Sequence, residues 1–234
     1  MTPPLDLAAV MRRRMLEPDG IPAAWAARRA GAVPADGRLL VIAADHPARG
    51  ALGVRDDRRA MASRSDLLQR LAIAVSRPGV DGVLGTPDIL EDLLLAGLLD
   101  GFLVYGSMNR AGRQGAVFEL DDRFTAYDAA TIERLGLDGG KMLARVAYDD
   151  PATAPTLEAC GRAVTDLAER GKIALVGPFL SSRSADGWVR NLLDPDSVIT
   201  SVAIASGLGA TSAHTWLKLP VVPEMERVLD STTL

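Results

Sequence analysis

The sequence has 234 residues, of which 48% are hydrophobic and 24% charged, and these proportions are ordinary for a globular protein. The formal net charge of -4 and the 4% aromatic content argue against nucleic-acid binding, which needs a basic surface. No apolar run approaches the ~18 residues of a membrane span, and the N-terminus lacks the apolar core of a signal peptide. Cys160 is the single cysteine and closes no intrachain disulfide. These features disfavour nucleic-acid and membrane partners and predict a cytoplasmic protein.

Two short helices are expected at the start of the chain, over residues 5–16 and 21–30. The Pro18-Asp19-Gly20 break separates them, because proline and glycine interrupt helices. No strand-like run precedes them. We therefore treat residues 1–37 as an N-terminal helical segment that packs on the body of the fold.

After this segment, short apolar runs alternate with helical patterns. Helices are expected around residues 67–75 and over 87–99, 157–169 and 198–206. Strands are expected over 39–44, 80–84, 102–105, 141–147, 173–176 and 215–222.

Short hydrophobic strands that alternate with helices predict a parallel sheet covered by right-handed crossovers. Both a doubly wound sheet and a barrel satisfy this pattern. Polar or glycine-rich loops follow several strands, where a barrel places its active site, so we favour an α/β (β/α)8 TIM barrel over residues 38–234. Six βα units occupy the chain, and two more would need roughly 40 to 60 residues. We expect one barrel domain, incomplete at its C-terminus.

Lysine is rare in this sequence: of the 26 basic residues, only Lys141, Lys172 and Lys218 are lysines. Lys218 lies in the apolar run 215–222, where a charged amine is costly unless it faces a polar cavity. Burial favours the neutral amine, which can attack a carbonyl carbon to form an imine, whereas arginine cannot. Lys218 is therefore a candidate nucleophile. The alternative, a strand-end lysine whose amine reaches solvent, stays open.

Two cations, Lys141 and Arg145, are expected on one face of the strand over residues 141–147. Period-two alternation along residues 141–147 places Lys141, Leu143 and Arg145 on the same side. If that side is the barrel interior, Lys141 favours the neutral form of a nearby nucleophilic amine by charge repulsion. A strand-start lysine in solvent is the alternative.

Asp45 directly follows the first expected strand, at the end where barrels carry their catalytic groups. It is a candidate acid/base or hydroxyl-orienting residue, and a local turn cap is the alternative. His46 and His214 are the only histidines, too few for a zinc site with three histidine ligands. We expect no metal and no cofactor.

Other common motifs do not account for the function. The sequence has no Walker loop, Cys-x-x-Cys pair, His-Glu-x-x-His motif or Gly-x-Ser-x-Gly elbow. The glycine-rich stretch 207–212 follows a helix and precedes a strand, which is the reverse of a dinucleotide loop. Cys160 lies in an expected helix, and we assign it to core packing.

Three stretches together resemble the class I (Schiff-base) aldolase superfamily that includes deoxyribose-phosphate aldolase and tagatose-bisphosphate aldolase. They are Ala43-Ala44-Asp45-His46-Pro47-Ala48-Arg49-Gly50, Gly140-Lys141-Met142-Leu143 with Tyr148-Asp149, and Trp216-Leu217-Lys218-Leu219-Pro220-Val221.

The resemblance, which spans roughly residue 38 to the end, implies Lys218 as the imine-forming residue and Lys141 as a second lysine brought to the site. It also implies Tyr148 as a further acid/base candidate and substrate-binding roles for Asp45 and Arg49. Additional polar groups are expected to bind the substrate, and they are His46, Arg145, Ser181 and Arg183.

The whole pattern, including residues 207–218, resembles more narrowly an aldolase-like group of actinobacterial inositol catabolism. This resemblance implies a carbon-carbon lyase that acts on a phosphorylated keto sugar, with 2-deoxy-5-keto-gluconate 6-phosphate as a candidate substrate. The expected partner is a small-molecule sugar phosphate. A homo-oligomer is compatible with the sequence, which does not specify the oligomeric state.

One departure from the family pattern concerns residues 176–179. Relatives tend to carry a glutamate before Pro-Phe, whereas this chain has Val176-Gly177-Pro178-Phe179. A non-catalytic or degenerate sugar-phosphate-binding barrel is therefore the alternative hypothesis. An isomerase or another lyase on the same scaffold is a third, because a fold alone does not fix the reaction.

Overall fold

The computed structural model describes residues 5–185 and 187–234, and it divides into two compact units. The N-terminal unit consists of Met1–Ser107 and Thr131–Asp138, and the C-terminal unit of Met108–Ala130 and Gly139–Leu234. Helix α5 (Ala129–Arg134) spans the boundary along the chain. Each unit contains parallel strands joined through helices, as the alternation of patterns predicts.

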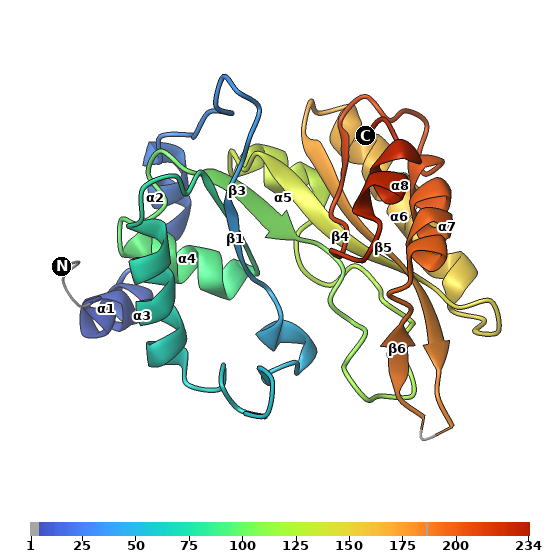
Figure 1. The fold of residues 1–234 in the computed structure, drawn as a ribbon. Coiled ribbons are helices and arrows are strands. Elements are labelled where there is room, and N and C mark those ends of the chain that lie inside the picture. Colours follow the sequence, from blue (N-terminus) through green and yellow to red (C-terminus); the bar gives the residue numbers. More distant parts are fainter. Residues whose placement is uncertain (1–4, 186) are drawn as a thin grey trace. The chain divides into compact units, whose positions relative to one another are not determined.

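The N-terminal unit contains a parallel three-stranded sheet in the order β1 (Val41–Ala44), β2 (Gly82–Gly85) and β3 (Leu103–Ser107). Helices α3 (Arg64–Val75) and α4 (Pro87–Leu95) are the crossovers between these strands. All residues of β2 and β3 are buried, which explains their continuous apolar character. The short 3-10 helix η1 (Pro47–Arg49) follows β1 (Figure 1).

Two N-terminal helices, α1 (Leu7–Leu16) and α2 (Gly20–Ala27), pack against α4. Asp92 of α4 is only 7% exposed, and its carboxylate accepts hydrogen bonds from Arg14 of α1 at 2.6 Å and from Arg64 of α3 at 2.6 Å. Two arginines compensate this buried carboxylate, so the ion pairs also join the three helices.

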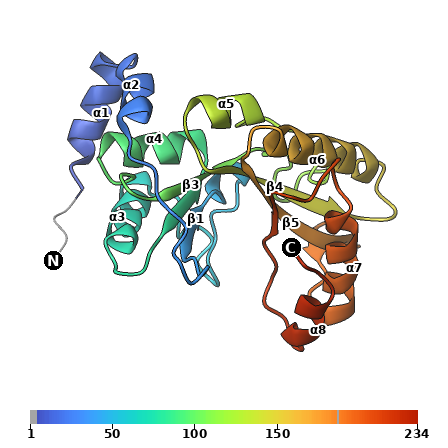
Figure 2. The same cartoon turned by 90° about the horizontal axis from the view of Figure 1, so that it is seen from above.

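In the C-terminal unit, β5 (Ile173–Arg183) pairs in parallel with β4 (Gly139–Val146) and with β7 (Thr215–Leu217). The end of β5 also pairs antiparallel with β6 (Val189–Asn191). The helices are α6 (Thr153–Ala168), α7 (Pro195–Ser206) and α8 (Met225–Asp230). Within this unit, α6 lies beside β4 and α7 beside β5 (Figures 1 and 2).

The two faces of β4 differ in chemistry. Met142, Ala144 and Val146 are between 0% and 4% exposed, as expected for the face covered by α6. Lys141 and Arg145 alternate with them and therefore lie on the opposite face. The sequence-based prediction that Lys141, Leu143 and Arg145 share one strand face is confirmed.

The last expected strand is shorter than predicted. The apolar run 215–222 forms a strand only over Thr215–Leu217. Pro220 has no N–H to donate to a strand ladder. Leu219 and Val222 instead pack with Val198, Val202 and Val228 in a core between α7 and α8. The prediction of a strand to residue 222 is wrong because these apolar residues fill a helical core.

Several other boundaries differ as well. Strand β5 extends to Arg183, beyond the predicted end at residue 176, and it turns into the unpredicted hairpin with β6. Helices α5 and α8 were not predicted. The longest described helix, α6, has 16 residues, and no described helix is both long and apolar enough to span a bilayer.

Cys160 on α6 is 0% exposed, which confirms its assignment to the core. Burial raises the pKa of its thiol to about 12, with a further contribution from the negative charge of Asp122. Because the thiolate is the reactive form, we expect no alkylation by iodoacetamide at pH 8 in the folded protein. Intact-mass measurement checks this, with a urea-unfolded sample as the control that should react fully. Complete labelling of the folded sample within minutes would contradict the burial.

Candidate active site

Lys218 is positioned by the pairing of β7 with β5. Trp216 is in register with Leu175, and the Lys218 N–H donates to the Val176 carbonyl oxygen at 2.8 Å, which continues the ladder beyond the last strand residue. Because alternate residues share a face, Lys218 lies on the same side as Trp216 and beside Gly177. It directly follows the carboxyl end of β7, the strand end where barrels carry active-site groups.

The side chain of Lys218 is exposed, which agrees with the alternative of a strand-end lysine whose amine reaches solvent. The strand ends one residue earlier, at Leu217, and in the described part of the chain β7 pairs with β5 alone. Among the described residues, the Lys218 amine makes no hydrogen bond or ion pair. Its amine is therefore accessible to a ligand without breaking an existing contact.

Lys141 lies on the same face of this sheet but is only 7% exposed. It is in register with Leu175 of β5, which in turn is in register with Trp216 of β7. Lys218 lies two strands across and two residues further along, so strand geometry places the two lysine Cα atoms about 12 Å apart. Both lysines can therefore approach one ligand on this face.

Arg145, on the same face of β4, is bound by Glu119. The Arg145 guanidinium donates to Glu119 Oε1 at 2.8 Å and also to the Glu119 main-chain oxygen. The two side chains are 8% and 7% exposed. Most of the Arg145 charge is thus compensated within the protein, which reduces what remains for a substrate anion.

The segment that carries Glu119 is attached to β4 through Asn109. Asn109 is fully buried, and its side-chain amide donates to the Leu143 carbonyl oxygen at 2.7 Å and accepts from the Leu143 N–H at 2.9 Å. The side chain of Asn109 thereby hydrogen-bonds both backbone groups of Leu143 in β4, as a neighbouring strand would. Asp122 accepts from the Gly112 N–H at 3.1 Å and closes the segment on itself.

The Glu119–Arg145 pair provides a test of this arrangement. Glu119→Gln keeps the shape but leaves a buried guanidinium without its counter-charge, so we expect a loss of about 3–5 kcal/mol in the free energy of unfolding. The matched control is Glu158→Gln, which removes an ion pair with Arg162 whose side chains are 66% and 72% exposed, and should cost less than about 1 kcal/mol. Urea denaturation measures both, and equal losses would contradict the buried pair.

Three further predicted residues lie at the carboxyl ends of β4 and β5. Ser181 is 6% exposed and its hydroxyl is 2.9 Å from Asn191 Oδ1 of β6. Arg183 donates to the Gly187 carbonyl at 2.9 Å and lies 3.4 Å from the Asp150 carboxylate. Tyr148 is 79% exposed in the turn after β4. Ser181 and Arg183 are held by the β5–β6 hairpin, whereas Tyr148 is open to solvent.

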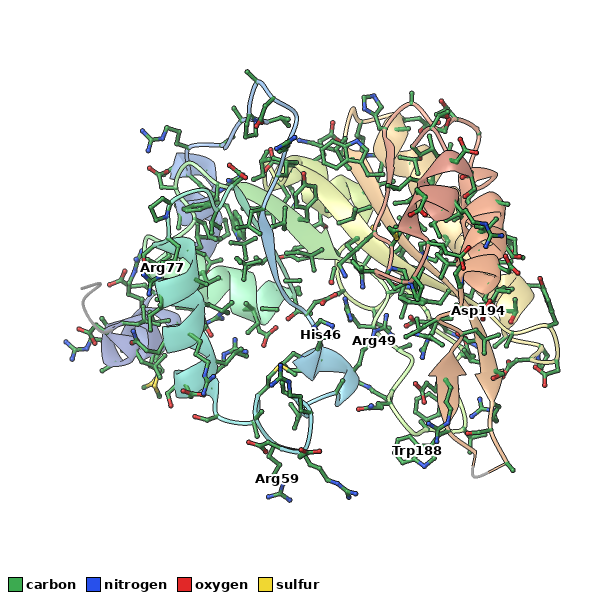
Figure 3. All side chains as sticks on the ribbon, viewed as in Figure 1. His46, Arg49, Arg59, Arg77, Trp188 and Asp194 are labelled. Atoms are coloured by element: carbon green, nitrogen blue, oxygen red, sulfur yellow. The ribbon has the colours of Figure 1, made fainter. Side chains whose placement is uncertain are left out.

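The N-terminal unit holds the remaining candidates after β1. Asp45 is 3% exposed and accepts a hydrogen bond from the Ser107 hydroxyl of β3 at 2.8 Å. His46 is mostly exposed, with its Nδ1 3.6 Å from Asp45 Oδ1, and Arg49 is 8% exposed. Figure 3 shows His46 and Arg49 on the same short segment around η1. The Ser107 contact links the ends of two strands, which goes beyond a local turn cap.

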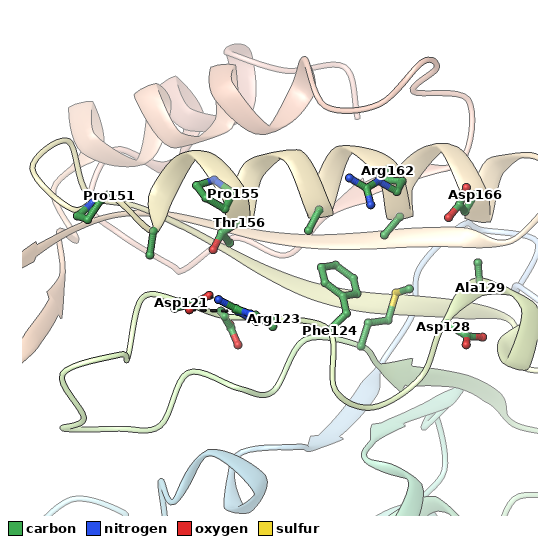
Figure 4. Close-up of a pocket in the computed structure, with 15 residues that line it drawn as sticks. Asp121, Arg123, Phe124, Asp128, Ala129, Pro151, Pro155, Thr156, Arg162 and Asp166 are labelled. Carbon is green, nitrogen blue, oxygen red and sulfur yellow. Dashed lines mark hydrogen bonds and ion pairs between the residues drawn. The ribbon is translucent and has the colours of Figure 1, made fainter.

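A pocket of about 570 Å³ lies elsewhere in the C-terminal unit, between α6 and the segment 121–129. Phe124 points toward α6, where Pro155 and Ala159 line the pocket, and Arg123 and Asp121 form an ion pair at its edge (Figure 4). None of the predicted site residues lines it. The pocket borders α6, whereas Lys141 and Lys218 lie on the other side of the sheet.

Among the described residues, no group of three or more His, Cys, Asp or Glu side chains is arranged to hold a metal ion. The sequence reasoning missed Asn109 and Glu119, whose roles depend on tertiary contacts with β4. The only signal in the sequence for these two residues is that a polar stretch follows the buried strand β3.

Comparison with solved structures defines the class of fold. The chain is similar to a Schiff-base-forming fructose-1,6-bisphosphate aldolase, with a TM-score of 0.53 and 17% identity over 90% of this chain and 85% of that chain. At this identity the similarity concerns the fold alone. The protein is a mixed α/β protein with parallel strands, consistent with a partial TIM-barrel-like fold.

The family is defined more closely. A family model described as Cgl0159-like matches residues 37–234, so the chain belongs to the Cgl0159-like family. The crystal structure of Cgl0159 from Corynebacterium glutamicum (Brevibacterium flavum) is similar at 51% identity with a TM-score of 0.96, over 100% of this chain and 79% of that chain. No curated protein matches significantly.

Proposed function

We propose that this protein is a class I aldolase that cleaves or forms a phosphorylated keto sugar through an imine on Lys218. The observation that carries the proposal is the accessible amine of Lys218 directly after β7, on the same sheet face as the buried cation Lys141. The aldolase-like fold supports it. The sequence motifs support 2-deoxy-5-keto-gluconate 6-phosphate, an intermediate of inositol catabolism, as the substrate.

The proposed chemistry needs one amine and a proton carrier. The Lys218 nitrogen attacks the substrate carbonyl carbon, and water leaves to give an iminium ion. The bond between the α- and β-carbons then breaks as a base removes the β-hydroxyl proton, so an aldehyde leaves and the electron pair forms an enamine. Protonation of the enamine and hydrolysis release the second product and restore the amine.

Roles for the other residues are part of the proposal. Asp45 handles a hydroxyl proton, with Tyr148 as the second acid/base candidate. Arg183 is better suited than Arg145 to bind an anionic group, because Arg145 already pairs closely with Glu119 whereas Arg183 lies 3.4 Å from its carboxylate partner. The remaining proposed substrate-binding residues are Arg49, His46 and Ser181. We further propose a sugar phosphate as the ligand and a cytoplasmic location.

Borohydride trapping tests the imine directly. With a candidate keto sugar phosphate, borohydride should leave a stable adduct on Lys218, which peptide mapping distinguishes from Lys141 and Lys172, the only other lysines. Lys218→Arg keeps the charge but should abolish the adduct and the turnover, because a guanidinium forms no imine under these conditions. Turnover that survives in Lys218→Arg would refute the mechanism.

The trapping experiment also distinguishes the proposed aldolase from the alternative function. The alternative is a non-catalytic sugar-phosphate binder, which Gly177 motivates because it stands where relatives tend to carry a glutamate. A rise in melting temperature with the sugar phosphate, without adduct or turnover, would support that binder.

Lys141 is proposed to assist imine formation on Lys218 through its positive charge. Lys141→Met, which removes the charge, should therefore slow adduct formation on Lys218 relative to the parent protein. Lys141→Arg retains the charge, is the matched control and should form the adduct at close to the parent rate. Equal slowing in both variants would indicate a steric role instead.

A further inference from the structure

The pocket between α6 and the segment 121–129 lies wholly within the C-terminal unit, and its size suits a small molecule. Its volume of about 570 Å³ falls in the range of roughly 300–1,000 Å³ that small-molecule sites occupy. None of the residues proposed for the imine chemistry lines it. An occupant of this pocket is therefore independent of the proposed function.

The space beside α6 is open because the side chains on one stripe of this helix are short. Ala152, Ala159 and Ala163 are seven and four residues apart, so they share one side of α6, and all three line the pocket. We call them the alanine stripe. On the opposite wall the half-buried ring of Phe124 points toward α6 (Figure 4). An apolar stripe and an aromatic ring that face open space favour an apolar occupant, because its burial releases water.

Hydrogen bonds hold the wall opposite α6 in place. The Met108 carbonyl oxygen accepts from the Thr125 N–H at 3.2 Å and from the Ala126 N–H at 3.0 Å. The Thr156 hydroxyl of α6 donates to the Leu120 carbonyl oxygen at 3.2 Å, which ties the helix to the start of this wall. The pocket is thus formed before any ligand binds, and a preformed site lowers the entropic cost of binding.

The charged groups around the pocket carry an excess of negative charge. They are four aspartates and two arginines, namely Asp121, Asp122, Asp128, Asp166, Arg123 and Arg162. Both arginines already pair with carboxylates, Arg123 with Asp121 at 3.0 Å and Arg162 with Glu158 at 2.6 Å. Within the described part of the chain, the Asp166 carboxylate makes no hydrogen bond or ion pair. The pocket therefore complements a cation better than an anion.

The apolar and anionic parts of the pocket are separated. Figure 4 shows Asp166 of α6 and Asp128 of the opposite wall toward the same end, whereas Phe124 lies nearer the middle. We propose that this pocket binds a small organic cation with an aromatic body. Its ammonium group lies at the end marked by Asp128 and Asp166. Its ring packs between Phe124 and the alanine stripe, where aromatic contacts add to the burial of apolar surface.

Titration calorimetry with three indoles of matched shape tests the charge and the shape of the ligand. Tryptamine is a cation near neutral pH, tryptophol is neutral and indole-3-propionate is an anion, and all three carry the charged or polar group on the same two-carbon linker. We expect saturable binding of tryptamine, at least about threefold tighter than that of tryptophol, as for a partly exposed ion pair. Indole-3-propionate should bind more weakly than tryptophol. Added salt should reduce the advantage of tryptamine, because it screens the aspartates.

Two variants with matched controls locate the site on α6. Ala159→Trp fills the pocket with an indole ring and should abolish tryptamine binding, whereas Ala154→Trp adds the same side chain at an exposed position outside the pocket and should bind as the parent does. Asp166→Asn should weaken tryptamine about threefold and change tryptophol by less than about 1.5-fold. Glu169→Gln removes an exposed carboxylate at the end of the same helix and should change neither. Ala159→Leu, which should still weaken tryptamine about threefold or more, serves if the tryptophan variant does not fold.

Each outcome decides the inference. Preferential binding of tryptamine that is weakened by the Ala159 substitution and by Asp166→Asn, with both controls unchanged, supports it. No saturable binding of tryptamine, or equal binding of the three indoles, overturns it. Tryptamine binding that persists unchanged in the Ala159 or the Asp166 variant places the cation elsewhere and also overturns it. None of these results depends on an imine at Lys218.

Discussion

The register of β5 between β4 and β7 is the constraint on which the lysine-bearing face depends. Side chains alternate along a strand, so a slip of one residue in β7 would turn Lys218 to the side of α7, where Val198 and Val202 are almost fully buried. A lysine in that core would lose its hydration without a partner. The hydrophobic contacts of the helices thus fix the register, and the register in turn fixes where the two lysine side chains can act.

The same face of β4 carries two buried cations, Lys141 and Arg145, and the segment before Asp122 supplies the counter-charge of Arg145. Buried polar groups are tolerated only when they are hydrogen-bonded, and the side-chain amide of Asn109 meets this condition for both backbone groups of Leu143. The Glu119 carboxylate accepts a hydrogen bond from the buried Arg145 guanidinium in the same way. Burial also lowers the pKa of Arg110 to about 10, because low-polarity surroundings disfavour its charged form, although the negative charge of Asp122 opposes this effect. This side of the unit is therefore organised by polar contacts, and the α6 side by apolar packing.

Features that depend on local pattern could be predicted from the sequence, and features that depend on distant partners could not. The alternation of strands and helices, the shared face of Lys141 and Arg145 and the burial of Cys160 follow from periodicity and composition. The end of β7 at Leu217 could not be predicted, because Leu219 packs into a helical core that the local sequence does not reveal. Nor could the partner of Arg145 be found, since Glu119 lies 26 residues away and reaches it only through tertiary folding.

Lys218 and Lys141 meet different requirements of the proposed imine chemistry. Lys218 follows the strand end and is exposed, so a ligand can reach its amine, but water surrounds it. Lys141 is buried in the third position of β4, where access is poor but its charge is weakly screened. The nucleophile must combine access with loss of solvent, and neither lysine has both in this structure. In the proposed mechanism, a substrate bound on this face would displace water from Lys218 and so supply the loss of solvent that the exposed amine lacks.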